Sequence, residues 1–410
     1  MPRDRQKGLI FGNPGHFLPT RDSRADSLKQ MEPIFIKDFT LPELEAWVES
    51  VGERRFRARQ IFKHVYVHQV SSWEECSDLS KMFRVQLEFG TRLHALTMLE
   101  KQVSSDGTAK YLFGLHDGHS IETVLIPDPP RTTLCVSSQV GCALGCAFCL
   151  TGTMGFKRNL KTAEIIDQVC QVRRDLGSRA HITNIVFMGM GEPLANYDTV
   201  VKSIRVMIDP NGLAFSHRRI TLSTAGLVPQ LARLGEESPV NLAISLHGAE
   251  DAVRDRIMPI NRTYPLSSLL DACRLYPLPP RKRITFEYIL IEGVNDSLGD
   301  ARNLVKLLSG LRAKVNLIPL NPHPGCDLKR PSEERVHAFQ EVLRKAHLTT
   351  LIRQSRGADI RAACGQLAAG YARSRCATVA QAAGEGPGEL NSRKQTLDPP
   401  KSKGKRPHPG

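Results

Sequence analysis

Short apolar runs rich in β-branched residues alternate with longer amphipathic segments from about residue 105 onward. Runs of this kind are typical of buried strands, and segments 162–176 and 332–346 carry the apolar period of a helix. Six successive β/α units predict an α/β fold in which a parallel sheet curls into a partial (β/α)6 barrel. The predicted strands are 132–138, 182–189, 218–226, 240–247, 283–291 and 314–321, followed by a seventh run at 348–354.

A small N-terminal helical domain is predicted before the barrel. In segment 40–53, Thr40 and Glu43 form a capping box, and apolar residues recur every three or four positions until Gly52 ends the helix. Segment 56–69 is predicted to be a second helix, and its basic face fits either a phosphate backbone or ordinary solvent. Its expected inward residues are Phe56, Ile61, Phe62 and Val65, and its expected polar face holds Arg55, Arg57, Arg59, Lys63, His64 and His68.

The rest of the chain divides by pattern. Segments 110–115 and 120–126 are predicted to pair as a hairpin across the turn HDGHS. The two ends show no apolar period and are predicted to be disordered. The predicted parts are a flexible arm (1–30), the N-terminal helical domain (31–100), the hairpin and barrel with a C-terminal cysteine segment (101–376), and a disordered basic tail (377–410).

Charge and composition narrow the class of protein. The chain carries 56 Lys and Arg against 42 Asp and Glu, a net charge of +14, which favours a polyanionic partner such as nucleic acid over an ordinary basic surface. It contains neither an apolar run of membrane-spanning length nor the apolar block of a secretory signal. We therefore predict a cytoplasmic protein whose ten cysteines are free thiols or cofactor ligands rather than disulfides.

Polar motifs follow the predicted strands where each strand ends. In β/α barrels the chemistry lies at the carboxyl ends of the strands, on the loops that follow. This coincidence predicts one active site at that edge of the sheet. The motifs are CxxxCxxC (142–149), GMGEP (189–193), STAG (223–226), SLH (245–247) and NPHPG (321–325).

The three cysteines of the first loop, Cys142, Cys146 and Cys149, suit a [4Fe–4S] cluster. A short loop can supply three thiolates, and one iron then stays open for an exogenous ligand. A structural zinc site competes with this interpretation, but structural zinc is held by four protein ligands and the sequence has no second CxxC pair. Unliganded structural cysteines are the other alternative.

The sequence resembles the RNA adenine C2 methyltransferases of the radical S-adenosylmethionine superfamily. The resemblance spans about residues 31–376. It rests on long collinear motifs: CVSSQVGCALGCAFCLTGTMGFKRNL, MGMGEPLANY, RRITLSTAGLVP, AISLHGA, RIMPINR, NLIPLNPHPG and RQSRGADIRAACGQL. Members of this family in bacteria modify an adenine of 23S rRNA and an adenine beside the tRNA anticodon.

The resemblance implies a radical reaction, and the chemistry of adenine C2 explains why one is needed. C2 lies between two ring nitrogens and is too electron-poor to attack a sulfonium methyl group. A [4Fe–4S] cluster held by the three cysteines would cleave S-adenosylmethionine to a 5′-deoxyadenosyl radical. Cys364 matches the family's methyl carrier, Cys135 the cysteine that resolves the covalent RNA link through a disulfide, and Glu122 the proton acceptor. Two molecules of S-adenosylmethionine would be used per turnover.

The resemblance also implies ligands and partners. A flipped-out adenine of 23S rRNA or tRNA, an external electron donor and a monomeric enzyme are expected. The matching S-adenosylmethionine contacts are Gly191, Glu192, Ser223, Ser245, Leu246, His247 and Asn321. The N-terminal domain is expected to bind RNA, together with basic residues near the barrel mouth: Lys157, Arg158, Arg218, Arg219 and Arg356.

Three other functions compete with this one. A related enzyme class methylates C8 of adenine with the same set of cluster-binding and catalytic cysteines. A non-catalytic RNA-binding protein with a structural cluster would leave Cys135 and Cys364 without a purpose. A radical enzyme that activates another protein would not need the basic N-terminal domain.

Overall fold

The computed structural model describes residues 34–323 and 325–368. The arm predicted at 1–30 and the tail predicted at 377–410 lie outside these residues. One sheet of ten strands dominates the fold, and its strand order is β14-β13-β12-β11-β10-β9-β6-β5-β4-β3. The strands are β3 (Leu96–Val103), β4 (Ala109–Leu115), β5 (Ser120–Asp128), β6 (Arg131–Cys135), β9 (Asn184–Phe187), β10 (Ile220–Thr224), β11 (Asn241–Ser245), β12 (Ile284–Leu290), β13 (Ala313–Pro319) and β14 (Thr350–Ile352).

The parallel part of this sheet confirms the predicted partial barrel. Strands β6, β9, β10, β11, β12, β13 and β14 pair in parallel in chain order. Each coincides with one of the seven predicted runs, except that β6 and β13 begin one residue earlier than predicted. Every residue of β12 is buried, as expected for a parallel strand covered on both faces. The predicted hairpin is β4 and β5, and it joins the barrel because β5 pairs with β6 in antiparallel fashion.

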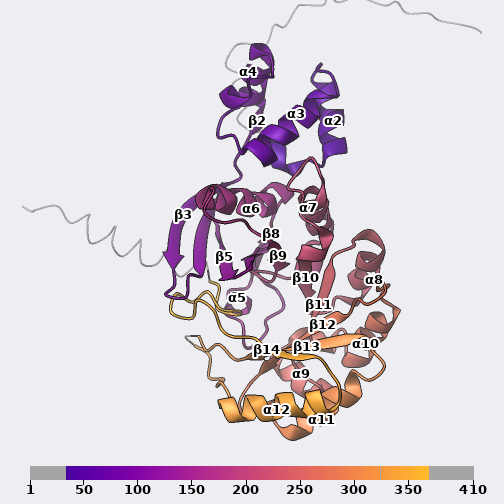
Figure 1. Ribbon diagram of the computed structural model, residues 1–410. Helices are drawn as coiled ribbons and strands as arrows, with labels where there is room; N and C mark the ends of the chain where they lie inside the picture. The colour runs from indigo at the N-terminus through magenta and orange to yellow at the C-terminus, as the bar shows by residue number, and fades with distance from the viewer. Residues whose placement is uncertain (1–33, 324, 369–410) are drawn as a thin grey trace, which may run out of the picture. The chain divides into compact units, whose positions relative to one another are not determined.

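Helices connect the parallel strands and lie along the outside of the sheet (Figure 1). Each carries an apolar face toward the strands, as in α12, where Val336, Phe339 and Leu343 are buried and Ser332 caps the first turn. The helices after the first barrel strand are α5 (Leu150–Thr153), α6 (Thr162–Leu176), α7 (Tyr197–Ile208), α8 (Val228–Glu237), α9 (Asp251–Ile257), α10 (Leu266–Leu275), α11 (Leu298–Leu307) and α12 (Glu333–Lys345).

The N-terminal residues form the predicted helical domain with two local differences. The capping box is present, since the Thr40 N–H donates to Glu43 Oε2 at 2.8 Å. Phe56, predicted to face inward, is 48% exposed. The second helix ends at Lys63 and continues as a single π-helical turn. The elements are β1 (Ile34–Phe35), η1 (Ile36–Asp38), α2 (Leu41–Ser50), α3 (Arg57–Lys63), η2 (His64–His68), η3 (Trp73–Glu75), α4 (Lys81–Gly90) and β2 (Thr91–Arg92).

His64 does not lie on the outer basic face predicted for this helix. It still has helical backbone geometry and lies three positions after the buried Ile61, so its ring falls on the inward face, where it is buried and its Nε2 lies 2.5 Å from Asp78 Oδ1. The imidazole therefore holds two parts of the domain together. Arg55 stays exposed, as predicted, but it pairs with Glu45 on α2 at 2.6 Å.

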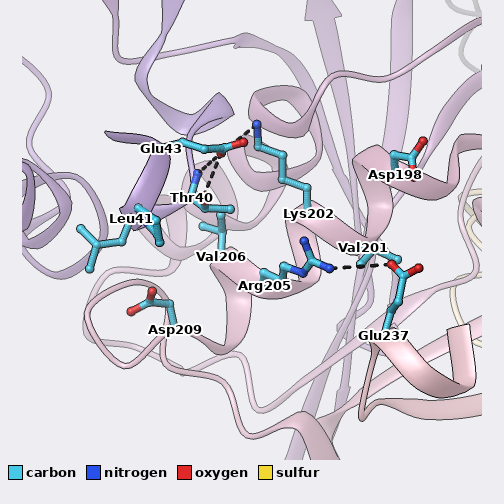
Figure 2. A pocket seen from close by; sticks show the side chains of 11 residues that line it. Thr40, Leu41, Glu43, Asp198, Val201, Lys202, Arg205, Val206, Asp209 and Glu237 are labelled. Carbon is cyan, nitrogen blue, oxygen red and sulfur yellow. Dashed lines mark hydrogen bonds and ion pairs between the residues drawn. The ribbon is translucent and has the colours of Figure 1, made fainter. Parts of the chain in front are cut away.

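Buried polar contacts attach the N-terminal domain to helix α6. The Lys37 ammonium pairs with the Asp167 carboxylate, and both side chains are almost completely buried. Asp38 Oδ1 accepts the Ala163 N–H at 2.8 Å in the first turn of α6. A more exposed contact joins Glu43 to Lys202 of α7 at 2.9 Å, at the edge of a cavity of about 500 Å³ (Figure 2).

Strand β3 was not predicted. Its first residue, Leu96, is buried, but most of the following side chains are exposed, so the strand shows no alternation of apolar and polar positions. It is the edge strand of the sheet, where the partner β4 supplies the pairing. No helix among the described residues is both long enough and apolar enough to cross a membrane.

Candidate active site

A cavity of about 950 Å³ lies within the curved sheet. Its walls include the loops that follow β6, β9, β10, β11 and β13, as the motif positions predict. Ligand pockets span roughly 300–1,000 Å³, so this one has room for a cofactor and a nucleotide base. The five cysteines singled out from the sequence all line it: Cys135, Cys142, Cys146, Cys149 and Cys364.

The loop that carries three of these cysteines is fixed at its base and along its length. Strands β7 (Gln139–Gly141) and β8 (Phe156–Asn159) pair in antiparallel fashion and close the base. Gly141 has φ +73°, and a Cβ there would lie 1.9 Å from the Gly155 carbonyl oxygen, so only glycine fits. Leu144 and Phe148 pack against an apolar cluster that includes Met258. The loop is therefore positioned by packing before any ligand binds.

The three thiols fit the donor set of a cluster. Burial raises the pKa of Cys142 to about 11 and raises the pKa of Cys146 and Cys149 as well, so a bound cationic group is needed to hold them as thiolates. Among the described residues, no group of three or more His, Cys, Asp or Glu side chains is arranged to hold a single metal ion. A [4Fe–4S] cluster takes each thiolate on a different iron, which suits three thiols that share a cavity without converging on one point.

Six of the seven predicted S-adenosylmethionine contacts line the cavity; Leu246 does not. Leu246 is completely buried, and its N–H donates to the Glu287 carbonyl. Gly191 has φ +100°, and a Cβ there would lie 2.5 Å from the Gln139 side chain, so the turn needs glycine. The Glu192 carboxylate accepts the N–H groups of Leu194 and Ala225 at 2.9 and 2.8 Å. This side chain therefore holds the loops after β9 and β10 together.

The remaining contacts present polar groups from neighbouring loops. The hydroxyls of Ser223 and Ser245 lie 3.5 Å apart on adjacent strands. The His247 ring stacks edge-on against Phe148 of the cysteine loop, with 4.9 Å between ring centroids. Burial lowers the pKa of His247 to about 3, so the imidazole is neutral and its Nδ1 accepts the Ile289 N–H at 3.0 Å. Asn321 Nδ2 lies 3.4 Å from the Cys364 carbonyl oxygen, toward which it donates.

Cys364 lies on a segment that crosses the cavity, residues 357–368, which we term the C-terminal cysteine segment. Gly365 O accepts the Leu150 N–H at 2.7 Å, and Leu367 O accepts the Thr151 hydroxyl at 2.7 Å. Gly365 has φ +82°, and a Cβ there would lie 3.0 Å from the Phe148 carbonyl oxygen. The backbone on both sides of Cys364 is thus held against the cysteine loop, while its thiol is exposed to the cavity.

Cys135 and Cys364 line the same cavity although they are far apart in the chain, one on the first barrel strand and the other after the last. Cys135 is the last residue of β6 and is buried, and both thiols are free. Removal from bulk water raises the pKa of each, and the neighbouring Cys364 adds to the rise at Cys135. The structure therefore brings together the two cysteines that lie outside the three-cysteine loop.

Glu122 is buried beside this pair rather than on the cavity wall. It shares a face of β5 with Val124 and Ile126, which do line the cavity. Its Oε2 accepts the Ala368 N–H at 2.6 Å, and its Oε1 lies 3.3 Å from Lys110 Nζ. Burial raises the pKa of Glu122, while Lys110 and the Ala368 N–H oppose that rise. The carboxyl group thus also anchors the end of the C-terminal cysteine segment.

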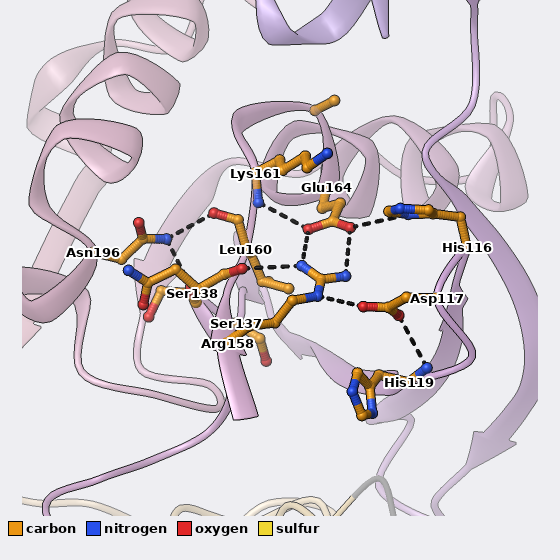
Figure 3. Close-up of polar contacts among 12 residues, drawn as sticks. His116, Asp117, His119, Ser137, Ser138, Arg158, Leu160, Lys161, Glu164 and Asn196 are labelled. Carbon is orange, nitrogen blue, oxygen red and sulfur yellow. Dashed lines mark hydrogen bonds and ion pairs between the residues drawn. The ribbon is translucent and has the colours of Figure 1, made fainter. Parts of the chain in front are cut away.

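Arg158 is fully engaged within the protein and is a poor candidate for a phosphate contact. Its guanidinium makes two bonds of 2.8 Å to the buried Glu164 carboxylate and one of 2.5 Å to Asp117 (Figure 3). These ion pairs raise its pKa. Lys157 is exposed. Arg356 lines the cavity 3.8 Å from Asp128.

Arg218 and Arg219 are both exposed and immediately precede β10. They therefore lie at the amino end of that strand, opposite the loops that were expected to form the mouth.

Two residues that sequence reasoning missed support the site. Arg254 is completely buried and donates to the Ala225 and Leu246 carbonyls at 2.7 and 3.0 Å, which ties together the loops after β10 and β11. Lys110 reaches Glu122 across the β4–β5 pair. Arg254 lies just before the motif RIMPINR, but nothing in the spacing of a single arginine indicates that it is buried.

Comparison with known proteins identifies the family. Residues 136–305 match the model of the radical SAM superfamily, and residues 34–91 match that of the ribosomal RNA large subunit methyltransferase N-terminal domain. The dual-specificity RNA methyltransferase RlmN of Syntrophobacter fumaroxidans is 71% identical over 341 residues, which cover 83% of this chain and all of that protein. The chain belongs to the RlmN family of dual-specificity RNA methyltransferases.

Other members of the RlmN family agree with this assignment. The RlmN of Geobacter sulfurreducens is 55% identical over 82% of this chain and 92% of its own length. The crystal structure of a radical SAM methyltransferase from Sphaerobacter thermophilus superposes with a TM-score of 0.80 and 46% identity, and covers 82% of this chain and all of that one. The family and the radical SAM fold expected from the sequence are both confirmed.

Proposed function

We propose that this protein methylates C2 of adenine in RNA, in 23S rRNA and beside the anticodon of tRNA. One observation carries the proposal: two free thiols outside the cysteine loop, Cys135 and Cys364, face the same cavity as the three cysteines of that loop. A radical SAM enzyme needs three cysteines for its cluster, and two more in the cavity supply the sulfur chemistry of methyl transfer. The RNA substrates follow the dual specificity for which the relatives are named.

The cavity residues divide into two sets by the ligand they would hold. Cys142, Cys146 and Cys149 would bind one [4Fe–4S] cluster per chain. Gly191, Glu192, Ser223, Ser245, His247 and Asn321, with Leu246 behind them, would position S-adenosylmethionine. When bound, these two groups supply a 5′-deoxyadenosyl radical. The polar loops, tied together through Glu192 and Arg254, hold the pocket in shape without further rearrangement.

The chain's own residues would then carry the methyl group. The Cys364 thiol, which is exposed to the cavity, would receive a methyl group and carry it to the adenine. Cys135 would then bond to the Cys364 sulfur as the bond from that sulfur to the RNA-borne carbon breaks, and the resulting disulfide would be reduced by an external reductant. Glu122 would accept a proton, which requires its ionised form. The raised pKa of Glu122 sets the lower pH limit of that role.

The wider assignments extend the same proposal. The adenine would be flipped out of its stack to enter the cavity, and the N-terminal domain (31–100) would bind RNA beside the barrel domain (101–376). An external reductant would supply electrons, and the enzyme would act as a monomer in the cytoplasm.

Product analysis tests the proposal directly. Anaerobically reconstituted protein is incubated with S-adenosylmethionine, a reductant and unmodified 23S rRNA or tRNA, and the digested nucleosides are analysed by mass spectrometry. We expect 2-methyladenosine from both RNAs. Formation of 8-methyladenosine would support the C8 alternative. Absence of both methylated nucleosides and of 5′-deoxyadenosine would indicate a non-catalytic RNA-binding protein.

Substitution of Lys110 is expected to move the pH dependence of this activity. Lys110→Met removes a cation 3.3 Å from Glu122, so the pKa of Glu122 rises further. The fraction of ionised Glu122 then falls at a given pH, and the acid limb of the rate profile shifts upward by about one pH unit. Product formation is measured between pH 5.5 and pH 9, a range chosen to bracket that limb.

The matched control for Lys110 is Lys101→Met on the neighbouring strand. Lys101 pairs with Asp175 at 2.6 Å and has no contact with Glu122. Its loss is expected to leave the acid limb in place. An unchanged profile in Lys110→Met would show that Glu122 serves only as an anchor for the C-terminal cysteine segment.

A further inference from the structure

The cavity of the active site continues to the opposite, amino ends of the barrel strands, and its lining there becomes basic. Arg218 precedes β10, and Lys314 is the second residue of β13. The run Arg281–Lys282–Arg283 immediately precedes β12. We term these five cations the amino-edge cluster. Cys135 ends β6 at the carboxyl edge of the same sheet, and Cys364 lines the cavity with it, so one continuous space joins the cluster and the thiols.

The charge of the amino-edge cluster is not neutralised by the protein. Among the described residues, no carboxylate lies within 4.0 Å of any of its five cationic groups. Of the three other Lys and Arg residues of the cavity wall, Arg131 and Arg356 share Asp128 at 2.6 and 3.8 Å. The third, Arg353, follows β14 and, in the described part of the chain, makes no ion pair with a carboxylate either. The amino-edge cluster nevertheless gathers five such cations at one edge of the sheet, and their counter-charge must come from a ligand.

Neutral groups hold these cations in place. Lys282 Nζ donates to Asn241 Oδ1 at 2.6 Å, and Arg283 donates to the Thr349 hydroxyl at 2.6 Å. Asn241 and Thr349 also line the cavity. Burial and the nearby cations Arg283, Arg353 and Lys282 lower the pKa of Lys314, although Glu287 opposes this effect. A cluster that repels itself, yet is oriented by uncharged partners, is a preformed site for an anion.

Arg281 adds an independent observation. Its φ is +65°, in the left-handed region that favours glycine or asparagine, and its side chain is exposed in the cavity lining. An arginine costs free energy in this conformation, so the sequence keeps a cation where the backbone favours a smaller residue. Strain of this kind occurs preferentially at functional sites.

We propose that the amino-edge cluster binds phosphates of the RNA substrate next to the target adenine. This inference rests on the proposed function, because RNA must be the substrate if the cluster is to set the direction from which it approaches. The RNA backbone meets the barrel at the amino ends of the strands, and the flipped base crosses the cavity toward Cys364. Cations without carboxylate partners suit the phosphodiester backbone of RNA, because neutralising its phosphates releases the counterions bound to them. The cysteine loop then approaches the base from the opposite side.

A charge-removing double variant, Arg281→Gln with Arg283→Gln, tests the proposal. Binding of an unmodified tRNA anticodon stem-loop is measured by fluorescence anisotropy at several salt concentrations. We expect binding to weaken on the order of tenfold for each cation removed. The slope of log Kd against log salt should fall by about one for each lost phosphate contact. A double variant that retains charge, Arg281→Lys with Arg283→Lys, should keep most of the affinity.

The matched control removes the same charge from the outer surface. Arg302 and Lys306 are exposed on α11 and lie outside the cavity lining. Arg302→Gln with Lys306→Gln is expected to change neither the affinity nor the salt slope appreciably. Equal affinity in the amino-edge and control variants would overturn the proposal.

A second readout separates this proposal from the proposed function. Methylation of Cys364 uses S-adenosylmethionine and no RNA, and it is followed by the mass of the peptide that contains Cys364. We expect the amino-edge variant to methylate Cys364 as wild type does while it binds RNA weakly. Equal loss of RNA binding in the glutamine and the lysine double variants of Arg281 and Arg283 would show that positive charge at these positions does not bind the RNA, and would overturn the proposal. If wild type itself never methylates Cys364, the proposed function fails, and the binding comparison still decides whether the cluster holds RNA.

Discussion

A Cys364→Ala protein is expected to form no detectable 2-methyladenosine, a loss of at least about 10³-fold. The substitution removes the only thiol of the C-terminal cysteine segment, and the other free thiol outside the cysteine loop that lines the cavity, Cys135, is buried at the end of β6 and has a separate proposed role. The thiol is exposed to the cavity, and the segment is held by backbone contacts of Gly365 and Leu367, so the fold should remain intact. Nucleoside mass spectrometry and the iron content of the same preparation measure the two properties separately.

Two further cysteine variants make this experiment specific. Cys326 is half-buried, and its sulfur lies 3.9 Å from the Ala147 carbonyl oxygen beside the cysteine loop, so Cys326→Ala removes a thiol from the same region. It should retain activity. Cys135→Ala should stall with RNA attached to Cys364, which appears as a slower band on a denaturing gel. Normal product from Cys364→Ala, with iron unchanged, would refute the role of this cysteine as methyl carrier.

Loss of the buried Asp167 carboxylate should produce the largest change in stability. Asp167 pairs with Lys37, and its Oδ2 accepts the N–H groups of Ala95 and Leu96 at 2.8 and 3.0 Å. Asp167→Ala leaves a buried ammonium and two buried N–H groups without a partner. Breaking such a pair costs about 3–5 kcal/mol, measured as the free energy of unfolding by urea titration. The N-terminal domain should detach first, because Lys37 and Ala95 connect it to α6.

The response of this pair to pH has a defined sign. Lys37 is the main attraction that lowers the pKa of Asp167 below its usual value, against the opposing effect of burial. The stabilisation is therefore complete above the unfolded pKa, near 4, and is lost as the pH falls toward the folded pKa. The difference between wild type and Asp167→Ala should be constant from pH 6 to pH 8 and shrink in acid.

Two comparisons test whether the buried charge is the cause. The combination of Lys37→Met with Asp167→Asn removes both charges and keeps a side-chain oxygen that can accept the Ala95 and Leu96 N–H groups, so it should be more stable than Asp167→Ala alone. Lys101→Met breaks a more exposed pair, with Asp175, and leaves the bond from the Tyr111 hydroxyl to Asp175 in place, so it should cost less than about 1 kcal/mol. A small effect of Asp167→Ala, equal to that of Lys101→Met, would contradict this account.

Much of the barrel could be predicted because its strands are buried on both faces. Runs such as 283–291 are apolar at nearly every position, and the motif after each run marks where the strand ends. The same logic placed Cys142 and Gly191 at one edge of the sheet. Cys364 is different, because its sequence context alone indicates only a buried cysteine. Its link to the site came from the family resemblance.

The features that were missed depend on contacts between distant segments. Strand β3 has a single buried residue at its start, so its pairing with β4 leaves no periodic pattern. His64 lies on the inward face three positions after Ile61, and its pairing with Asp78, fourteen positions away, leaves no local pattern in the sequence. Lys110 meets Glu122 only across the paired strands. The basic lining at the amino ends was predicted in part, through Arg218, but was assigned to the opposite edge of the barrel.

The docking of the C-terminal cysteine segment also sets an order of events during synthesis. Ala368 contacts Glu122, 246 positions earlier, and Leu367 contacts Thr151, 216 positions earlier. A nascent chain therefore completes every barrel strand before the segment that spans the cavity leaves the ribosome. Until then this segment cannot cover the cysteine loop. Cys364, the proposed methyl carrier, therefore lies on the last part of the cavity lining to be synthesised.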